Sequence, residues 1–216
     1  MSEVRVVRRW PANEYADGTA AAPARATPSA RLRMIAIAGS TGAPGVIADI
    51  LETIAPSLAC PVVIVQHLAE SFVDGFAAWL RQRTRLAVTV AQHGMHAARR
   101  GVYLAPDDLH LGIGPDAEMV LTRGPAEEGF RPCANHLFRS VAANFGRAAL
   151  GIVLTGMGRD GAAGLLELRR AGGITVAQDE ASSPVFGMPA EAIRMRAAMH
   201  VLSPADIASF VASCCV

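Results

Sequence analysis

Three short runs of almost uninterrupted apolar residues constrain the fold of this chain more than any other feature. They are MIAIAG at residues 34–39, PVVIV at 61–65 and ALGIVL at 149–154, and a stretch with helical spacing of apolar residues comes after each one. A strand that is apolar on both faces has to be covered on both faces, as in a parallel sheet. We therefore expect an α/β fold with a mostly parallel, doubly wound sheet packed between helices.

The remaining elements are predicted from periodicity and turn residues. Helices are expected at 43–56, 71–84, 136–146, 160–173, 189–197 and after Ser203-Pro204, with Ser71 and Asp160 as N-caps of their own helices. Strands are expected at 174–180 and 198–202. The segments 86–94, 101–114 and 118–124 have Gly and Asp at their turns, which predicts a region of antiparallel hairpins.

Residues 1–30 differ in composition from the rest of the chain. They are rich in Ala, Pro and Thr and lack strand or helix periodicity, so we expect a flexible leader at 1–30 and a single domain at 31–216. The leader has no apolar core of the kind that a secretory signal needs. No apolar run in the sequence approaches the roughly 18 residues that cross a membrane, so membrane insertion is not expected.

Charge and cysteine content narrow the classes of function. Lys and Arg number 20 against 19 Asp and Glu, a net charge of +1, so there is no electrostatic reason to expect nucleic acid as a partner. The four cysteines contain no C-x-x-C pair, and neither a zinc site nor a disulfide framework is expected; they are Cys60, Cys133, Cys214 and Cys215. Free thiols suit the reducing cytoplasm.

Side chains suited to catalysis come directly after three of the predicted buried strands. Ser40 lies where the first strand turns into a helix, His67 ends the second strand, and Asp160 closes the turn after the third. In a parallel sheet these ends share one edge, where ligands bind. Serine there can act as a nucleophile, histidine as its base, and aspartate as the group that orients the histidine. Taken singly, each has a simpler interpretation as a helix cap or a structural histidine, but together they predict a hydrolase.

The glycine-rich turn at residues 39–45 has a second interpretation, as a dinucleotide-binding loop. That motif needs an acid at the end of the next strand to bind the ribose, whereas the second strand ends in Gln66-His67. An NADP-binding, Rossmann-like protein could use a cation there instead, so this class of function stays as an alternative.

Several segments resemble the catalytic domain of the CheB-type protein-glutamate methylesterases. They are AIAGSTGAPG, VVIVQHL with FVDGFAAWL, RRGVYLAPDDLHL, LFRSVA, IVLTGMGRDGAAGLLELRRAGGITVAQDE and VFGMPAEAI, and they span about residues 32–211. The resemblance implies a three-layer αβα sandwich and a Ser-His-Asp triad of Ser40, His67 and Asp160. It also implies that the backbone N–H groups of Thr41 and Met157 stabilise the oxyanion, and that no metal or organic cofactor is needed.

The resemblance also implies a substrate. Members of the family remove methyl groups from glutamyl esters on bacterial chemoreceptors, release methanol, and can deamidate receptor glutamines. We therefore expect the cytoplasmic helices of a methyl-accepting receptor as the partner, with Arg131, Arg159 and Phe72 as candidates for contact with its surface. A non-catalytic interaction module derived from such an esterase is a further alternative, and the intact triad argues against it.

Departures from the family pattern put the substrate in question more than the reaction. Where the family usually has Arg-Pro-Ser-x-Asp, this chain has Cys133 and Asn135 in place of the serine and the aspartate. We expect this change to alter a substrate contact or a local hydrogen bond. Chemotaxis members usually carry a receiver domain ahead of the esterase, and residues 1–30 are too few to form one. Regulation would then need a separate regulatory protein or control of expression.

Overall fold

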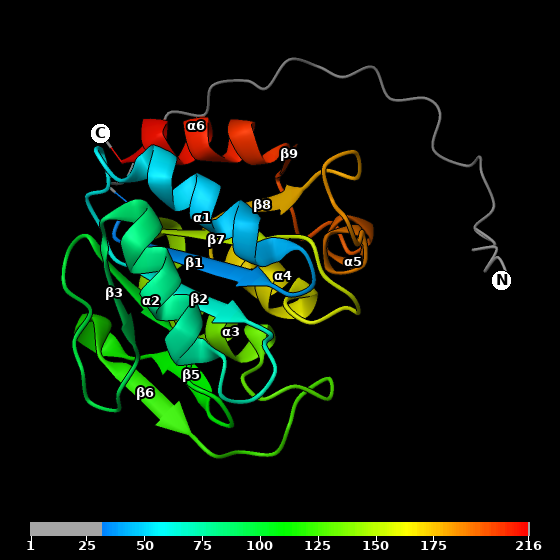
Figure 1. Ribbon diagram of the computed structural model, residues 1–216. Coiled ribbons are helices and arrows are strands. Elements are labelled where there is room, and N and C mark those ends of the chain that lie inside the picture. Colours follow the sequence, from blue (N-terminus) through cyan, green and yellow to red (C-terminus); the bar gives the residue numbers. More distant parts are fainter. Residues whose placement is uncertain (1–31, 216) are drawn as a thin grey trace, which may run out of the picture.

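The computed structural model describes residues 32–215, and the leader expected at 1–30 lies outside this range. Within it, seven strands form one sheet in the order β3-β4-β2-β1-β7-β8-β9, and every neighbouring pair is parallel (Figure 1). The strands are β1 (Met34–Gly39), β2 (Val62–Gln66), β3 (Ala87–Val90), β4 (Gly101–Leu104), β7 (Ala149–Val153), β8 (Ile174–Gln178) and β9 (His200–Leu202).

Helices cover both faces of the sheet, as the apolar runs predict. One face carries α1 (Ala43–Ile54), α2 (Val73–Thr84) and α6 (Pro204–Cys214), and the other carries α3 (Ala134–Phe145), α4 (Ala162–Arg170) and α5 (Met188–Arg194). The predicted three-layer αβα fold is therefore confirmed. No helix in the described part of the chain is long and apolar enough to cross a membrane.

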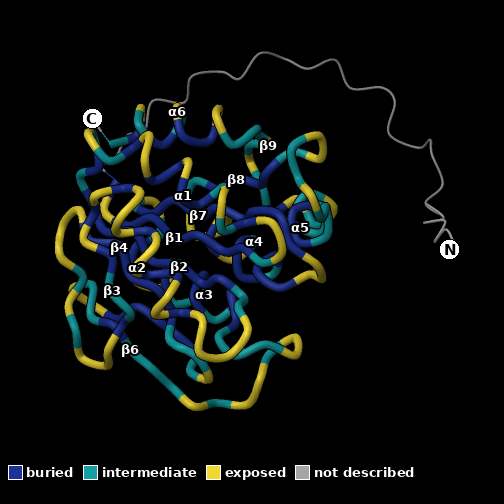
Figure 2. The backbone as a smooth tube through the Cα atoms, viewed as in Figure 1, coloured by how far each residue is buried: buried dark blue, intermediate teal, exposed yellow. Residues whose placement is uncertain are grey.

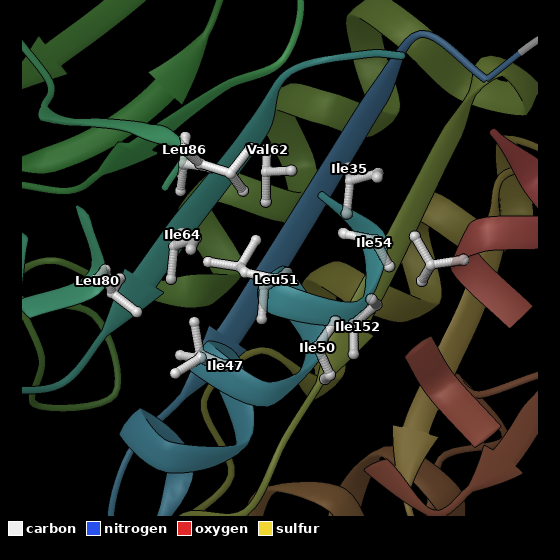
Figure 3. Packing of buried hydrophobic residues seen from close by; sticks show 14 of the residues in the cluster. Ile35, Ile47, Ile50, Leu51, Ile54, Val62, Ile64, Leu80, Leu86 and Ile152 are labelled. Carbon is white, nitrogen blue, oxygen red and sulfur yellow. The ribbon is translucent and has the colours of Figure 1, made fainter. Parts of the chain in front are cut away.

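The core lies on either side of the central strands β2, β1 and β7, which are buried along their whole length (Figure 2). On the α1 side, Ile47, Leu51 and Ile54 of the helix pack with Ile35 and Ile152 of the strands (Figure 3). Burial of each such side chain contributes roughly 1.5–3 kcal/mol to folding. The three candidate turns therefore follow strands that are buried along their whole length.

The predicted hairpin region is correct only in its last part. β5 (His110–Ile113) and β6 (Met119–Thr122) form an antiparallel pair outside the main sheet. The segments at 86–94 and 101–104 instead supply β3 and β4 to the parallel sheet, where β4 pairs with β2. The reason is that β4 is buried at all of its residues, like the central strands, and a strand covered on both faces fits a parallel sheet.

Two of the predicted helix caps are wrong. Ser71 has a left-handed backbone, with a φ of 68°, and within residues 32–215 it provides no side-chain cap for α2. Asp160 does not cap α4, because the N-cap of that helix is Gly161. Its carboxylate instead accepts hydrogen bonds from the N–H groups of Ala134 and Asn135, at 2.7 and 3.0 Å. Asp160 thereby caps α3, a helix that begins 26 residues earlier in the chain.

The N-terminal ends of α3 and α4 cap each other. Asp160 caps α3, and in return Oδ1 of Asn135 in α3 accepts a hydrogen bond from the N–H of Gly164 in α4, at 2.8 Å. The helices approach this closely because residue 164 is glycine: a Cβ there would lie 2.6 Å from the Asn135 carbonyl oxygen. The two reciprocal caps hold both helices, and with them the Asp160 carboxylate, in one relative position.

We predict that substitutions of two helical glycines will have opposite effects. Gly164→Ala is expected to lower the free energy of unfolding by roughly 1–3 kcal/mol, because the new methyl group overpacks the α3–α4 contact. Gly75→Ala in α2 is the matched control, since a Cβ there would meet none of the described atoms within 4 Å. It is expected to raise the free energy of unfolding by roughly 0.5–1 kcal/mol through helix propensity.

Urea unfolding of both variants beside the unsubstituted protein measures this. A Gly164→Ala protein as stable as Gly75→Ala would show that the α3–α4 contact has room for a side chain, contrary to the geometry.

Candidate active site

The three predicted turns lie side by side at the carboxyl edge of the sheet. β2, β1 and β7 are neighbours in that order. The N–H of His67 donates to the Gly39 carbonyl at 3.0 Å, and the N–H of Ser40 donates to the Thr155 carbonyl at 3.0 Å. Asp160 ends the turn after β7 and reaches back to His67. The structure thus brings Ser40, His67 and Asp160 to one edge, as expected of strands that run in parallel.

Close packing around Ser40 requires glycine at the neighbouring positions. A Cβ on Gly156 would lie 2.7 Å from the Cβ of Ser40, and a Cβ on Gly39 would lie 2.5 Å from that of Ala43. The N-cap of α1 is Gly42, with a φ of 85°, so Ser40 is not the residue that caps this helix. Its hydroxyl makes no hydrogen bond to any described residue. The simple capping interpretation of this serine is therefore wrong, and its Oγ is available for chemistry.

His67 and Asp160 form the one side-chain hydrogen bond between predicted triad members in the described structure. Nε2 of His67 lies 2.9 Å from Oδ2 of Asp160, and the two side chains are only 8% and 0% exposed. The other ring nitrogen, Nδ1, is buried and has no partner among residues 32–215. Because His67 and Ser40 come directly after a pair of neighbouring strand residues, Nδ1 is the nitrogen left for the serine.

The Asp160 carboxylate is held in its charged form. Burial pushes the pKa of Asp160 up, but hydrogen bonds from His67, from the Cys133 thiol and from the two amides at the start of α3 outweigh burial. The pKa of Asp160 therefore lies below its usual range. A carboxylate can only accept a hydrogen bond, so Nε2 is the nitrogen that donates to Asp160, and the tautomer this favours presents Nδ1 as an acceptor.

The departures at Cys133 and Asn135 lie close to the Asp160 carboxylate and the start of α4. Both residues are buried. Sγ of Cys133 donates to Oδ1 of Asp160 at 2.9 Å, while Asn135 caps α4 through Gly164. Both side chains therefore make hydrogen bonds around the Asp160 carboxylate and the start of α4, and the effect of the two departures on substrate contact stays a prediction.

The two candidate oxyanion donors lie on adjoining loops. Neither the N–H of Thr41 nor that of Met157 has a hydrogen-bond partner in the described range, so both can donate to a ligand. Thr155, in the same turn as Met157, joins the two loops, because its Oγ1 donates to the Thr41 carbonyl at 3.0 Å. The same oxygen accepts from the N–H of Val185, in the loop before α5, at 3.0 Å. Two unpaired amides on loops next to a serine turn form an arrangement that could stabilise a developing oxyanion.

Gln66 links two of the candidate turns, a role that the sequence analysis did not predict, since it noted only that residue 66 is not an acid. Its side-chain Nε2 donates to the carbonyl oxygens of Ser40, at 2.9 Å, and of His67, at 3.0 Å. The amide therefore ties the serine turn to the histidine turn, at the position where a dinucleotide-binding fold would carry its ribose-binding acid. In the sequence, the feature that could have indicated this role is a polar residue at the end of a buried strand.

The three candidates for contact with a receptor surface differ in what they do. Arg131 donates to Asp108 and to the Gly124 carbonyl, and Arg159 donates to Glu128. Both guanidinium groups thus have partners within the domain, and their contact with a receptor surface stays a prediction. Phe72 remains a candidate, because its side chain is 64% exposed. Within residues 32–215, no group of three or more His, Cys, Asp or Glu residues could hold a metal ion.

Comparisons with known proteins agree with one another. The family model described as CheB methylesterase matches residues 35–211. A protein-glutamate methylesterase/protein-glutamine glutaminase of Syntrophus aciditrophicus is 41% identical over 211 residues, which are 96% of this chain and 60% of that protein. FrzG of Myxococcus xanthus, a protein-glutamate methylesterase, is 46% identical over 169 residues, which are 78% of this chain and 51% of that protein. The chain spans roughly half to three fifths of these relatives.

A solved structure gives the same result for the fold. The crystal structure of the Thermotoga maritima CheB methylesterase catalytic domain matches with a TM-score of 0.80 at 28% sequence identity. The match covers 84% of this chain and 97% of that domain.

Asp160 is predicted to make stability depend on pH. Because the pKa of Asp160 is lowered by folding, its contribution is complete above the unfolded value of about 3.9 and is lost as the pH falls through the folded value. We expect Asp160→Asn to lower the free energy of unfolding by roughly 2–4 kcal/mol at pH 7. The difference from the unsubstituted protein should shrink below about pH 4. Urea unfolding at a series of pH values from 7 to 3 measures it.

Asp49→Asn is the matched control, because Asp49 is an exposed partner of Arg83 on the surface. It should change the free energy of unfolding by less than about 0.5 kcal/mol. If Asp160→Asn behaved like Asp49→Asn, the carboxylate would not be the cap of α3.

Proposed function

The chain belongs to the CheB methylesterase family, and on that premise we propose that it hydrolyses γ-glutamyl methyl esters on methyl-accepting chemoreceptors, with Ser40 as the nucleophile. One observation carries the proposal: His67 contacts the buried Asp160 carboxylate through Nε2, at 2.9 Å, while its Nδ1 has no partner in the described structure. The names of the curated relatives, protein-glutamate methylesterases and glutaminases, support this choice of substrate.

In the proposed first half of the reaction, Nδ1 of His67 takes the proton of the Ser40 hydroxyl as Oγ attacks the ester carbonyl carbon. The imidazole becomes positively charged, and the Asp160 carboxylate at Nε2 stabilises that charge. The proton then passes from Nδ1 to the leaving oxygen, which departs as methanol, and the glutamyl group stays on Ser40 as an ester.

The N–H groups of Thr41 and Met157 are the proposed donors to the tetrahedral oxyanion. Both are unpaired among the residues that the structure describes, and Thr155 joins the loops that carry them. Loss of one such donor typically costs about 10²–10³ in rate. Because both are backbone groups, the side chains at 41 and 157 can vary without removing them.

In the second half, water takes the place of the leaving alcohol. His67 removes a proton from the water as it attacks the acyl group, and then returns that proton to Ser40 Oγ, so that glutamate is released. The same steps convert a glutamine side chain to glutamate when ammonia is the leaving group, and we include receptor deamidation in the proposal. Every step uses a protein group, and none requires a metal or an organic cofactor.

The proposed partner is a receptor helix that presents its glutamyl side chain at the carboxyl edge of the sheet. Phe72 and Met157 follow β2 and β7 at this edge, and their side chains are 64% and 68% exposed. They are the apolar contacts that we propose for the receptor surface. A cytoplasmic location is part of the proposal, since the four cysteines of the chain, all within residues 32–215, are free thiols.

We predict that Ser40→Ala abolishes methanol release from methylated receptor membranes, because no other group would form the acyl-enzyme. Methanol measured over time, with the unsubstituted protein and the variant at equal concentration, gives the answer. Ser209→Ala is the matched control: this serine is an exposed residue of α6, whose hydroxyl bonds only its own helix, and its variant should release methanol at the unsubstituted rate.

Equal release by the protein and by Ser40→Ala would discard Ser40 as nucleophile. Absence of release from both would contradict the proposed substrate. In that case calorimetry with NADP(H) and a receptor-binding assay would decide between the dinucleotide-binding and the binding-only alternatives.

A further inference from the structure

Phe130 makes a face-to-face contact with the proposed catalytic base. Its ring lies parallel to the His67 imidazole, with an angle of 2° between the planes and 3.9 Å between the ring centroids. From this geometry we propose that Phe130 is a positioning residue that fixes the plane of the His67 ring for proton transfer. The inference rests on the proposed function, because it assumes that His67 serves Ser40 as a base.

The His67 ring needs such a contact because one hydrogen bond does not fix a plane. Nε2 is held by Asp160 at 2.9 Å, but Nδ1 has no partner in the described chain. The last torsion of a histidine side chain is broad, so the ring can tilt about the point where Asp160 holds it. A flat ring stacked at van der Waals distance blocks that tilt. With the plane of the ring fixed, Nδ1 points in one direction. For proton transfer to occur, that direction has to be toward Ser40.

The contact also favours the charged state of the base. When His67 takes the serine proton it becomes a cation, and a cation over an aromatic face is stabilised by the ring quadrupole. Phe130 covers one face of the imidazole and excludes water from it. The stacking therefore helps both the orientation of the neutral base and the stability of the imidazolium that it becomes.

A tight turn presents the Phe130 ring. Glu127 and Phe130 exchange two backbone hydrogen bonds, at 2.8 and 3.1 Å, and the residues between them have left-handed backbones: Glu128 with a φ of 52° and Gly129 with a φ of 82°. This is the two-residue hairpin turn in which both central residues have positive φ. A non-glycine residue at positive φ is strained, and such strain persists where the surroundings hold it in place.

Ion pairs on three sides hold this turn. Glu127 pairs with Arg139 of α3, and Glu128 pairs with Arg159, the residue next to Asp160. Arg131, directly after Phe130, donates to Asp108 in the loop between β4 and β5. The turn is thus attached to the helix that Asp160 caps and to the loop that carries Asp160. This explains why two arginines that look available for a substrate are engaged within the domain.

Two variants of Phe130 distinguish the effect of an aromatic face from the effect of side-chain volume. Phe130→Leu keeps an apolar side chain but has no aromatic face, while Phe130→Tyr keeps the face. The first measurement is the rate at which a fluorophosphonate labels Ser40, a reaction in which the Oγ–P bond forms as fluoride leaves and His67 takes the hydroxyl proton. We expect Phe130→Leu to be labelled roughly 10-fold more slowly and Phe130→Tyr within about 2-fold of the unsubstituted rate. In the methanol-release assay, Phe130→Leu should lower kcat, while its KM stays within about 2-fold of the unsubstituted value.

The second measurement tests the stacking itself. In protein labelled at histidine, the ring protons of His67, assigned by their loss in His67→Gln, should be shifted upfield by the Phe130 ring current. The shift should persist in Phe130→Tyr and vanish in Phe130→Leu. Since Phe130 is only partly buried, thermal unfolding of both variants should stay close to that of the unsubstituted protein.

The outcomes separate this inference from the proposed function. Labelling of Phe130→Leu at the unsubstituted rate, or a His67 ring signal that no Phe130 variant moves, overturns the positioning role and leaves the triad intact. Labelling of Ser40 that slows in Phe130→Leu, without methanol release from receptor, supports the positioning role and refutes the substrate. A protein that is not labelled at Ser40 at all refutes the proposed mechanism, and the positioning role with it.

Discussion

The carboxylate of Asp160 is a fully buried charge, and much of the structure depends on how that charge is compensated. Among the described residues, four donors surround it: the amides of Ala134 and Asn135, the Cys133 thiol and the His67 ring. An unpaired charge at this depth would cost several kcal/mol. The N-terminus of α3 therefore has to lie against Asp160, and the same carboxylate orients the imidazole. One carboxylate thus supports both the start of α3 and the orientation of the His67 ring.

The sheet and the edge that carries the candidate site could be predicted because they follow from short-range patterns. Strands that are apolar on both faces have to lie in a covered parallel sheet, and parallel strands place their carboxyl ends together. Ser40, His67 and Asp160 are found at one edge for that reason alone, before any family pattern is considered. The observed order β2-β1-β7 puts the three turns next to one another, and no spacing in the sequence specifies this order.

The parts that sequence reasoning missed are set by contacts between distant segments. β4 joins the sheet by pairing with β2, and β3 joins it by pairing with β4, which the local turn residues do not reveal. Asp160 looks like the cap of the helix that follows it, yet it caps a helix 26 residues earlier. Arg131 and Arg159 look like free cations, because their partners Asp108 and Glu128 lie 23 and 31 residues away. The charge of a residue and its place at the start of a helix indicate which interactions it can make. The tertiary fold determines the partner with which it makes them.

Cys133 shows how the surroundings of the carboxylate tolerate a change that looks serious in the sequence. The position needs a hydrogen-bond donor of suitable reach. Burial and the negative charge of Asp160 raise the pKa of the Cys133 thiol, so the sulfur keeps its proton and donates to Oδ1 at 2.9 Å. A thiol is a weaker donor than the serine hydroxyl that the family usually has there. Of the other three donors, two are the backbone amides of Ala134 and Asn135, which any side chain at 133 leaves in place. The third is the His67 ring itself, so the two amides together with the thiol are what hold the carboxylate toward it.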